Sequence, residues 1–495
     1  MSQTIVIFGA SGDLTSRKLI PALYQLYRKN RLRETVRIVG FSRTPMSDEQ
    51  WRNKLAETTQ TFSGGTFTQE KWDAFSQMIH YFSGDIEKSG FDGLETYLRS
   101  LENTGSDTES HANRLYYLST SPVFYASIAA KLGAAGMASE KEAANGTRRV
   151  IIEKPFGTNL ETAKTLNTAI HQVFKERQIY RIDHYLGKET VNNVLVFRFA
   201  NTMFEPVWNR NYIDNIQITA NEEVTVGHRA AFYEKAGILR DMFQNHLLQI
   251  LTFVLMEPPS RFEADAVRDE KVKVLRAIRA MAPEEVRTNT IRGQYRSYRD
   301  EPGVDKDSQT ATYAAVRLMA DNWRWKDVPI YLRSGKAMSC RTTQIVIQFK
   351  QPPHSMFQGE SGKRNKTIAA NRLLIQIQPA EGIQIYFQTK VPDTDMKCRE
   401  TTFNFNFRQS FQGELPEAYE RLLLDAMNGD ASLFARSDEV EAAWEIIDPI
   451  QNTWETQLAD HLSFYEAGSW GPNHAADWIR QFGQEWFDFC PLLHS

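Results

Sequence analysis

Residues 4–15 read TIVIFGASGDLT, and this stretch decides the fold of the first part of the chain. Residues 4–8 are all β-branched or aromatic, which is typical of a short buried strand. Two glycines follow closely, Gly9 and Gly12, and apolar residues at helical spacing continue from Lys18. A strand, a glycine turn and a helix in this order predict the first unit of a parallel sheet with helices on both faces.

The glycine turn is a candidate binding site for a dinucleotide. Glycines at this point allow a pyrophosphate to approach the free N–H groups at the start of the helix. The spacing is GxxG rather than GxGxxG, so a strand, turn and helix without a ligand stays open as the alternative interpretation. The candidate cofactor-binding residues of the turn are Gly9, Ser11, Gly12, Asp13 and Leu14.

The second predicted strand, residues 36–41, ends close to an arginine that bears on the choice of cofactor. An acidic residue at this point would bind the ribose 2′-hydroxyl of NAD, whereas an arginine suits the 2′-phosphate of NADP. Arg43 therefore favours NADP, with NAD as a possible second cofactor and a plain surface arginine as the alternative interpretation. Asp85 and Ile86 fall at a later strand end and are further candidates for cofactor binding.

A lysine follows another predicted strand, residues 149–152. The sequence there is EKPFG, so Lys154 falls at the carboxyl edge of the sheet, where ligands of doubly wound folds bind. At this edge Lys154 would reach the nicotinamide side of a dinucleotide and a sugar substrate together. A lysine held in a structural salt bridge is the alternative interpretation.

The pattern changes after about residue 200, where apolar and polar residues begin to alternate, as in antiparallel strands with one covered face. The predicted strands are residues 213–226, 344–350, 372–378, 382–389 and 401–407, and the predicted helices are residues 237–256, 265–278, 310–321 and 418–427. The chain is therefore predicted to combine α/β and α+β architecture. Residues 1–180 form a Rossmann-like dinucleotide-binding domain, and residues 181–495 form a larger domain with a big, mainly antiparallel sheet and helices.

The bulk composition excludes several classes of protein. A length of 495 residues predicts more than one domain, and the net charge of −3 argues against a general nucleic-acid-binding protein. We find no apolar run long enough for a membrane span and no signal-peptide pattern, so a cytoplasmic protein is expected. Cys340, Cys398 and Cys490 are far apart in sequence, which predicts neither a zinc ribbon nor a disulfide framework.

Residues 181–189, RIDHYLGKE, concentrate charged and hydrogen-bonding side chains between a strand-like run and a helix-like run. The start of a helix binds anions through its free N–H groups and the positive end of its dipole. His184, Tyr185 and Lys188 would add donors at the same place, whereas Asp183 suits the orientation of an imidazole. A solvated charged turn is the alternative interpretation.

His246 lies in an apolar helical stretch beside Leu247 and Leu248. A satisfied histidine of the core is one interpretation of such a residue. A general base is the other, because burial tends to keep an imidazole neutral and a carboxylate on its second nitrogen fixes the tautomer. Asp183 is the candidate for that carboxylate.

Several ordered blocks of sequence together resemble one family, glucose-6-phosphate dehydrogenase. The blocks are GASGDL from Gly9, EKPFG from Glu153, RIDHYLGKE from Arg181, RDMFQNHLLQ from Arg240, DNWRW from Asp321, YLRSGK from Tyr331, AYERLLLDAMNGD from Ala418 and GSWGP from Gly468. They extend over nearly the whole chain, and RIDHYLGKE is highly specific to that family. The chain therefore resembles the bacterial type of this family.

The resemblance implies oxidation of D-glucose 6-phosphate at C1 to 6-phospho-D-glucono-1,5-lactone with hydride transfer to NADP, the first step of the oxidative pentose phosphate pathway. It implies that His246 is the general base and that Asp183 pairs with it, with no metal. The substrate-binding residues that it implies are His184, Tyr185, Lys188, Glu222, Asp241, Lys336, Arg341 and Lys154. It also implies a homodimer or homotetramer formed through residues 181–495.

Three positions depart from the family pattern. Ala311 stands where a glutamate is common, and Arg341 stands where bacterial relatives often carry a lysine near the substrate. Residues 119–122, STSP, replace a more apolar approach to a double proline. We expect these changes to tune affinity for substrate and cofactor rather than to remove activity.

Two other functions stay open at this point. A dehydrogenase of an unphosphorylated sugar would share the dinucleotide domain and the EKP lysine, but the basic cluster at Lys188 argues against it. A non-catalytic NADP-binding regulator on the same fold predicts erosion of the catalytic set. Asp183, His246, Lys154 and Lys188 are all present, which argues against that function too.

Overall fold

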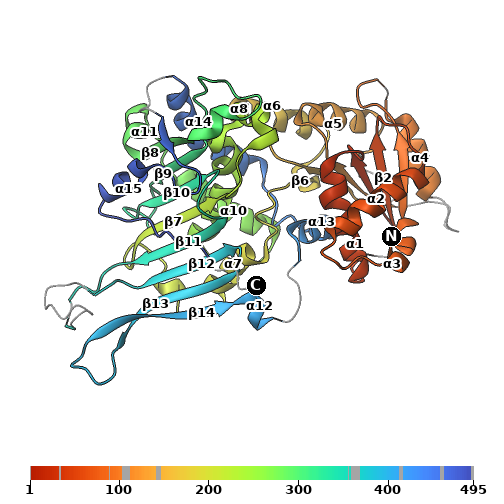
Figure 1. The fold of residues 1–495 in the computed structure, drawn as a ribbon. Coiled ribbons are helices and arrows are strands. Elements are labelled where there is room, and N and C mark those ends of the chain that lie inside the picture. Colours follow the sequence, from red (N-terminus) through yellow and green to blue (C-terminus); the bar gives the residue numbers. More distant parts are fainter. Residues whose placement is uncertain are drawn as a thin grey trace. The chain divides into compact units, whose positions relative to one another are not determined.

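The structure is a computed structural model, and it describes residues 2–32, 35–88, 90–102, 112–140, 146–354, 356–357, 368–411, 416–456 and 462–491. The chain forms two compact units. Unit 1 consists of Met1–Lys188, Ser260–Arg268 and Pro416–Glu441, and unit 2 of Glu189–Pro259, Asp269–Leu415 and Ala442–Ser495. Each unit is built around one sheet (Figure 1).

Unit 1 contains a six-stranded sheet in the order β3-β2-β1-β4-β5-β6. The strands are β1 (Gln3–Phe8), β2 (Val36–Ser42), β3 (Ile79–Ser83), β4 (Asn113–Leu118), β5 (Arg148–Ile152) and β6 (Ile179–Arg181). Every neighbouring pair is parallel, so all carboxyl ends meet at one edge of the sheet. This strand order is that of a doubly wound dinucleotide-binding fold, and the predicted Rossmann-like architecture is confirmed.

The helices of unit 1 form two contacting groups. In one group, α1 contacts α2, α3 and α13. In the other group, α5 contacts α6. The helices and short helical turns are η1 (Thr15–Leu19), α1 (Ile20–Arg28), α2 (Asp48–Phe62), α3 (Gln69–Ser76), α4 (Asp92–Glu102), η2 (Pro122–Phe124), α5 (Tyr125–Ala134), α6 (Leu160–His171), η3 (Glu176–Gln178) and α13 (Ala418–Asn428). Two such groups agree with helices on both faces of the sheet.

The turn between β1 and the first helix depends on Gly9. Its φ is +86°, a conformation that glycine adopts without strain, and a Cβ at this position would lie 2.1 Å from the carbonyl oxygen of Ser119. Thr15 closes the turn, because its hydroxyl donates to the Gly9 carbonyl at 3.2 Å and to Ser119 Oγ at 3.3 Å. The backbone of the β1 turn is thereby packed against the residues that follow β4.

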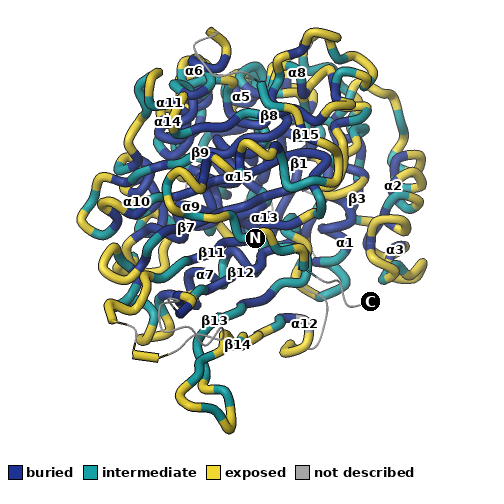
Figure 2. Tube along the Cα trace, turned by 60° about the vertical axis from the view of Figure 1, so that its left-hand side comes forward, coloured by how far each residue is buried: buried dark blue, intermediate teal, exposed yellow. Residues whose placement is uncertain are grey.

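Unit 2 contains a nine-stranded sheet in the order β14-β13-β12-β11-β7-β10-β9-β8-β15. The strands are β7 (Ile213–Asn221), β8 (Thr290–Tyr295), β9 (Tyr313–Leu318), β10 (Ile330–Gly335), β11 (Thr342–Phe349), β12 (Arg372–Gln378), β13 (Gly382–Lys390), β14 (Cys398–Asn406) and β15 (Ser463–Tyr465). Among the described strands of this sheet, only β7–β10 and β8–β15 pair in parallel, so the predicted mainly antiparallel sheet is confirmed. Figure 2 shows buried β7 and β9 and a largely exposed β14.

One predicted helix is wrong. Residues 310–321 were expected to be helical, whereas Tyr313–Leu318 form β9 between β10 and β8. All but one of the β9 residues are buried, because both faces of the strand are covered. A short apolar run of this kind has no period that separates a strand from a helix, and the pairing with β10 and β8 decides the outcome.

The remaining helices and helical turns are α7 (Glu189–Phe199), η4 (Glu205–Val207), η5 (Gly227–Arg229), α8 (Ala230–Ile238), η6 (Leu239–Leu247), α9 (Leu248–Leu255), α10 (Ala264–Ala277), α11 (Pro283–Asn289), η7 (Arg296–Asp300), α12 (Phe407–Ser410), α14 (Ser437–Glu455) and α15 (Asn473–Arg480). The predicted helix over residues 237–256 is present, but its first half, η6, is π-helical. In the part of the chain that the structure describes, each helix is too short or too polar to span a membrane.

A disulfide joins Cys340 to Cys490, which are 150 positions apart in sequence. No short-range spacing marks this bond, and the expectation that the cysteines form no disulfide framework is wrong for these two residues. The reason is that the β10–β11 turn and the C-terminal segment come together only through the sheet of unit 2. Cys398 is a free cysteine.

Replacing Gly9 with alanine is expected to lower the free energy of unfolding by about 2–4 kcal/mol, because backbone crowding adds to the strain of a positive φ. Gly64→Ala is the matched control: Gly64 also has a positive φ, +63°, but a Cβ there meets nothing within 4 Å. This control is expected to lose about 1 kcal/mol. Chemical denaturation measures both values, and equal losses would contradict the close approach of Gly9 to Ser119.

Candidate active site

The glycine turn of unit 1 lies against the end of β2. The N–H groups of Gly9 and Ala10 both donate to the Phe41 carbonyl, at 2.9 and 3.2 Å, and the Ser11 and Ser42 hydroxyls are 2.8 Å apart. Arg43 follows immediately and is exposed. The predicted cofactor residues of the turn are therefore brought to the strand end that carries Arg43.

The other residues predicted around this turn differ in their surroundings. Asp13 is exposed and lies 3.8 Å from Arg17, while Leu14 is half-buried at the start of η1. Asp85 and Ile86 follow β3, where the Asp85 carboxylate accepts from the N–H of Glu87 at 2.9 Å and the Ile86 carbonyl accepts from Lys131. All of these residues follow β1, β2 or β3, which are neighbours in the sheet.

Glu153 and Lys154 follow strand β5 on the other half of the sheet. Glu153 Oε1 accepts hydrogen bonds from the hydroxyls of Tyr117, at 2.5 Å, and Tyr419, at 3.1 Å. Burial raises the pKa of Glu153, although these two hydrogen bonds and the charge of Lys154 oppose the rise. Lys154 was predicted from the EKPFG motif, whereas no local pattern marks the two tyrosines, which lie far from it in the sequence.

The segment RIDHYLGKE begins at the end of β6. Arg181 is buried and pairs with Glu176 at 2.7 Å, so this arginine serves the structure of unit 1 and does not extend toward a ligand. Asp183 is 2% exposed, and its Oδ1 accepts from the N–H of Tyr185 at 2.9 Å. The Lys188 ammonium lies 5.0 Å from the centre of the Tyr185 ring, a cation–π contact.

Gly187 fits this segment against α13. A Cβ at Gly187 would lie 2.6 Å from the carbonyl oxygen of Ala418 and 2.9 Å from the Leu422 side chain. The ring centres of His184 and Tyr185 are 5.0 Å apart, and the Lys188 ammonium lies over the Tyr185 ring. The three side chains predicted to bind the phosphate therefore lie together. Part of the geometry of RIDHYLGKE is thus set by residues more than 200 positions later.

In unit 2, Lys336 lies between two carboxylates. Its ammonium is 2.9 Å from Asp241 Oδ2 and also pairs with Glu222, while the lysine itself is 1% exposed. Glu222 follows β7 and Lys336 follows β10, and these parallel neighbours bring their carboxyl ends to the same edge. Asp241 comes from the π-helical segment η6, so three elements contribute to one ion-pair cluster.

The electrostatics of Lys336 are those of a buried but well-compensated cation. Burial alone would lower the pKa of Lys336, but the charges of Asp241 and Glu222 outweigh this and raise its pKa above 10.5. The Tyr233 ring lies 5.5 Å from the ammonium, and the Tyr465 hydroxyl donates to the Lys336 carbonyl at 2.7 Å. Tyr233 and Tyr465 were missed by the sequence analysis, since no local pattern separates them from ordinary core tyrosines.

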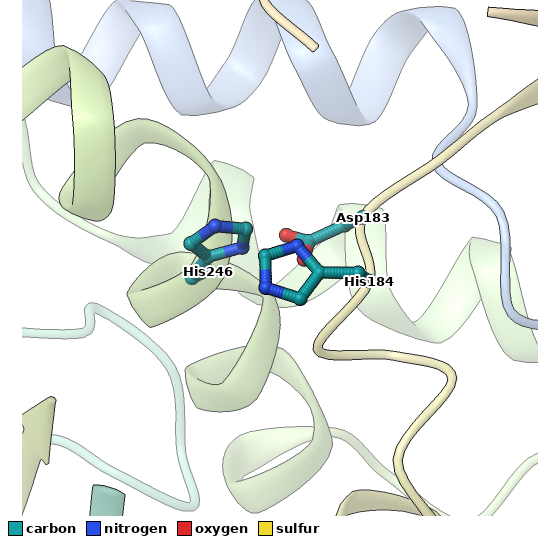
Figure 3. Close-up of side chains that lie close together, drawn as sticks. All are labelled: Asp183, His184 and His246. Carbon is teal, nitrogen blue, oxygen red and sulfur yellow. The ribbon is translucent and has the colours of Figure 1, made fainter. Parts of the chain in front are cut away.

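His246 lies on η6 and is 1% exposed. Asp183, His184 and His246 form a group in which one side-chain nitrogen or oxygen of each residue lies within 4.8 Å of those of the other two (Figure 3). This set of a carboxylate and two imidazoles suits proton transfer, and it is also a donor set that divalent metals use.

Arg341, which was predicted to bind the substrate, is exposed, and its guanidinium lies 3.5 Å from Gln378 Oε1.

Two family models together match almost the entire chain. The model described as glucose-6-phosphate dehydrogenase, NAD binding domain, matches residues 6–193. The model described as glucose-6-phosphate dehydrogenase, C-terminal domain, matches residues 195–487. The chain is 44% identical over 493 residues to a glucose-6-phosphate 1-dehydrogenase of Aggregatibacter actinomycetemcomitans, covering 97% of this chain and 96% of the relative.

Other relatives agree with this result. A glucose-6-phosphate 1-dehydrogenase of Treponema pallidum (strain Nichols) is 43% identical, with coverage of 97% of this chain and 94% of the relative. A solved structure of a glucose-6-phosphate dehydrogenase in complex with its substrate glucose-6-phosphate is 34% identical and has a TM-score of 0.89, over 98% of this chain and 99% of that chain. A glucose-6-phosphate 1-dehydrogenase structure from Mycobacterium avium is 35% identical, with a TM-score of 0.84 over 99% of both chains.

Replacing Lys336 with methionine is expected to cost about 3 kcal/mol of stability near neutral pH, because it leaves Glu222 and Asp241 without their cation. The control is Lys306→Met. Its ion pair with Asp300 is exposed, 76% and 75% for the two side chains, so a loss below about 0.5 kcal/mol is expected.

The same variant has an expected pH dependence. Because the pKa of Lys336 is raised in the folded state, its stabilisation is fully present below 10.5 and is lost as the pH rises through the higher folded value. The stability difference between wild type and Lys336→Met should therefore shrink in strongly alkaline solution. Denaturation at several pH values measures this, and a difference that grew with pH would contradict the ion-pair cluster.

Proposed function

We propose a function from one premise: the chain belongs to the glucose-6-phosphate dehydrogenase family. The protein oxidises D-glucose 6-phosphate at C1 to 6-phospho-D-glucono-1,5-lactone, with NADP as the hydride acceptor. The observation that carries this proposal is similarity over nearly the full length of glucose-6-phosphate 1-dehydrogenases, including a solved relative with its substrate. The same observation favours this activity over an unphosphorylated-sugar dehydrogenase or a non-catalytic regulator.

The chemistry requires a base for the proton of the C1 hydroxyl and an acceptor for the C1 hydride. When bound, the nicotinamide ring supplies that acceptor. We assign the base to His246, which takes the hydroxyl proton while the O–H electrons form the new C=O bond. Asp183 orients the imidazole and stabilises its positive charge after proton transfer, in agreement with their common group of polar atoms.

The phosphate of the substrate is assigned to His184, Tyr185 and Lys188. The Lys188 ammonium lies over the Tyr185 ring, and that ring lies beside the His184 ring, so three hydrogen-bond donors are presented together. Lysine and the N-terminus of α7 at Glu189 both favour a negatively charged group here. Anchoring a phosphate away from C1 supplies binding energy that positions the reacting carbon.

The sugar hydroxyls are assigned to Glu222 and Asp241, with Lys336, Arg341 and Lys154 as further substrate contacts. Carboxylates accept hydrogen bonds from hydroxyls, and their shared pairing with Lys336 holds both acids in place. Arg341 follows Lys336 in the same β10–β11 turn. A preorganised arrangement of this kind favours one sugar orientation over others.

The cofactor is assigned to the carboxyl edge of the unit 1 sheet, with Gly9, Ser11, Gly12, Asp13, Leu14, Arg43, Asp85, Ile86 and Lys154 as its contacts. The turn fits a dinucleotide because residue 9 adds no side chain to it: a Cβ at Gly9 would lie 2.1 Å from the carbonyl oxygen of Ser119, so only glycine fits there. Arg43 is exposed beside Ser42, where it is available to a 2′-phosphate. We therefore propose preference for NADP, with NAD as a weaker acceptor.

The wider assignments rest on the same premise. We propose that residues 1–180 carry dinucleotide binding and that residues 181–495 carry substrate binding and assembly into a homodimer or homotetramer. The proposed location is the cytoplasm, where glucose 6-phosphate and NADP are the partners of the protein. Neither a nucleic acid nor a membrane is proposed as a partner.

Steady-state kinetics test the proposed reaction. The protein is expected to reduce NADP with glucose 6-phosphate and to turn over free glucose at least about 10²-fold less efficiently, since the phosphate supplies binding energy. NADP should be preferred to NAD, and Arg43→Ala should raise KM for NADP about tenfold while leaving KM for NAD nearly unchanged. Arg99→Ala, at an exposed position of α4, is the control.

His246→Asn is expected to lower kcat by about 10²–10⁴, because a positioned base is lost while phosphate binding is retained. His228→Asn, a change at an exposed histidine of unit 2, is expected to keep wild-type turnover. Because proton transfer needs no metal, EDTA is expected to leave turnover unchanged. Near-normal turnover of His246→Asn would remove His246 as the base, and loss of activity in EDTA would favour a metal at this group.

A further inference from the structure

The disulfide between Cys340 and Cys490 is accessible from solvent. Cys490 is exposed and Cys340 is half-buried, while the remaining cysteine, Cys398, is free. A disulfide that a reductant can reach is labile, and disulfides of cytosolic proteins are commonly redox-sensing rather than structural. The placement of this bond in unit 2 therefore decides what its reduction would do.

On one side, the bond holds the C-terminal segment, residues 481–490. This segment begins with a turn at residues 481–483 and then has no regular secondary structure. This segment is attached to the sheet through side chains rather than through strand pairing. Gln217 of β7 donates to the Glu485 carbonyl at 2.9 Å and accepts from the N–H of Phe487 at 3.0 Å. Gln344 of β11 donates to the Phe487 carbonyl at 2.9 Å.

The last residues of the segment are fixed by few further contacts. Asp488 pairs with Arg333 of β10 at 2.8 Å, and the Arg372 guanidinium lies 4.6 Å from the centre of the Phe487 ring. Beyond Asp488, the described contacts are a stack of Phe489 on Phe487, a weak contact of the Ser339 hydroxyl with Cys490 Sγ at 3.8 Å, and the disulfide itself. The end of the segment thus depends on the covalent bond far more than residues 484–488 do.

On the other side, the bond holds the β10–β11 turn that carries Lys336 and Arg341. The Met338 N–H donates to the Glu222 carbonyl at 3.0 Å. The Ser339 N–H donates to the Ser469 carbonyl at 2.8 Å. Cys340 is thus two residues from a backbone contact with Glu222, whose carboxylate pairs with Lys336.

We propose that Cys340–Cys490 is a redox-modification site for a protein dithiol and that it controls the substrate-binding turn. A dithiol reduces the bond with two electrons and two protons: its thiolate attacks one sulfur, the other leaves as a thiol, and the mixed disulfide then resolves to give two cysteine thiols and the oxidised dithiol. Reduction releases the end of the C-terminal segment and loosens the turn at Cys340. The effect on catalysis rests on the proposed roles of Lys336 and Arg341, whereas the release of the segment does not.

Alkylation followed by peptide mass spectrometry tests the bond first. In protein prepared without reductant, Cys398 alone is expected to be alkylated, and after treatment with dithiothreitol or a thioredoxin all three cysteines should react. Hydrogen–deuterium exchange should then rise at residues 486–490 and 337–341 and stay unchanged in β1 and β4 of unit 1. Free Cys340 and Cys490 in the untreated protein, or unchanged exchange after reduction, would overturn the proposal irrespective of activity.

Kinetics test the consequence for the substrate. Reduction is expected to raise KM for glucose 6-phosphate by about three- to tenfold, with KM for NADP nearly constant, because contacts on the sugar are loosened but not removed. Cys490→Ser and Cys340→Ser should each reproduce the reduced enzyme and ignore dithiothreitol, while Cys398→Ser should respond as the wild type does. Equal KM values for glucose 6-phosphate in oxidised, reduced and Cys490→Ser protein would overturn the control of the turn.

The two hypotheses fail in different ways. If neither redox form oxidises glucose 6-phosphate, the proposed function is wrong, and the alkylation and exchange experiments still decide the redox site. If both forms are fully active with one KM, the proposed function stands and the redox control is refuted.

Discussion

A buried ammonium held by two carboxylates is the interaction on which the edge of the unit 2 sheet depends. Lys336, Glu222 and Asp241 come from the ends of β10 and β7 and from η6, and the Lys336 ammonium, whose side chain is 2% exposed, would be costly at this burial without the two carboxylates. For the carboxylates to neutralise the ammonium, the ends of β7 and β10 and the segment η6 must lie within reach of these side chains. The sheet register and the π-helical segment are therefore coupled through electrostatics as well as through packing.

In unit 1, the buried carboxyl group of Glu153 is stabilised mainly by hydrogen bonds. Two phenols, from Tyr117 and Tyr419, donate to one oxygen of this buried carboxyl group, and the charge of Lys154 also favours its ionised form. Burial raises the pKa of Glu153, whereas the acids around Lys336 are balanced by the charge of the lysine. Hydroxyl donors hold a group in place without adding charge beside Lys154.

The sequence alone predicts those elements and motifs whose structure is determined by neighbouring residues in the chain. The glycine turn, the parallel strands of residues 1–180 and RIDHYLGKE all have short-range signatures, and the predicted architecture is confirmed. The helix predicted over residues 310–321 was wrong, because a strand covered on both faces shows no alternation of apolar and polar residues. Tyr419 and the Cys340–Cys490 bond could not be found, because both contacts join segments whose proximity only the folded sheets create.

The contact of Gly187 with α13 has a consequence for the order of events during translation. Unit 1 includes Pro416–Glu441, and α13 supplies both the backbone against which Gly187 fits and the tyrosine that bonds Glu153. The sheet of residues 3–181 leaves the ribosome long before that helix exists. The nascent sheet of unit 1 must therefore persist as an incomplete intermediate, with its α13-binding surface open, until residue 441 has been synthesised.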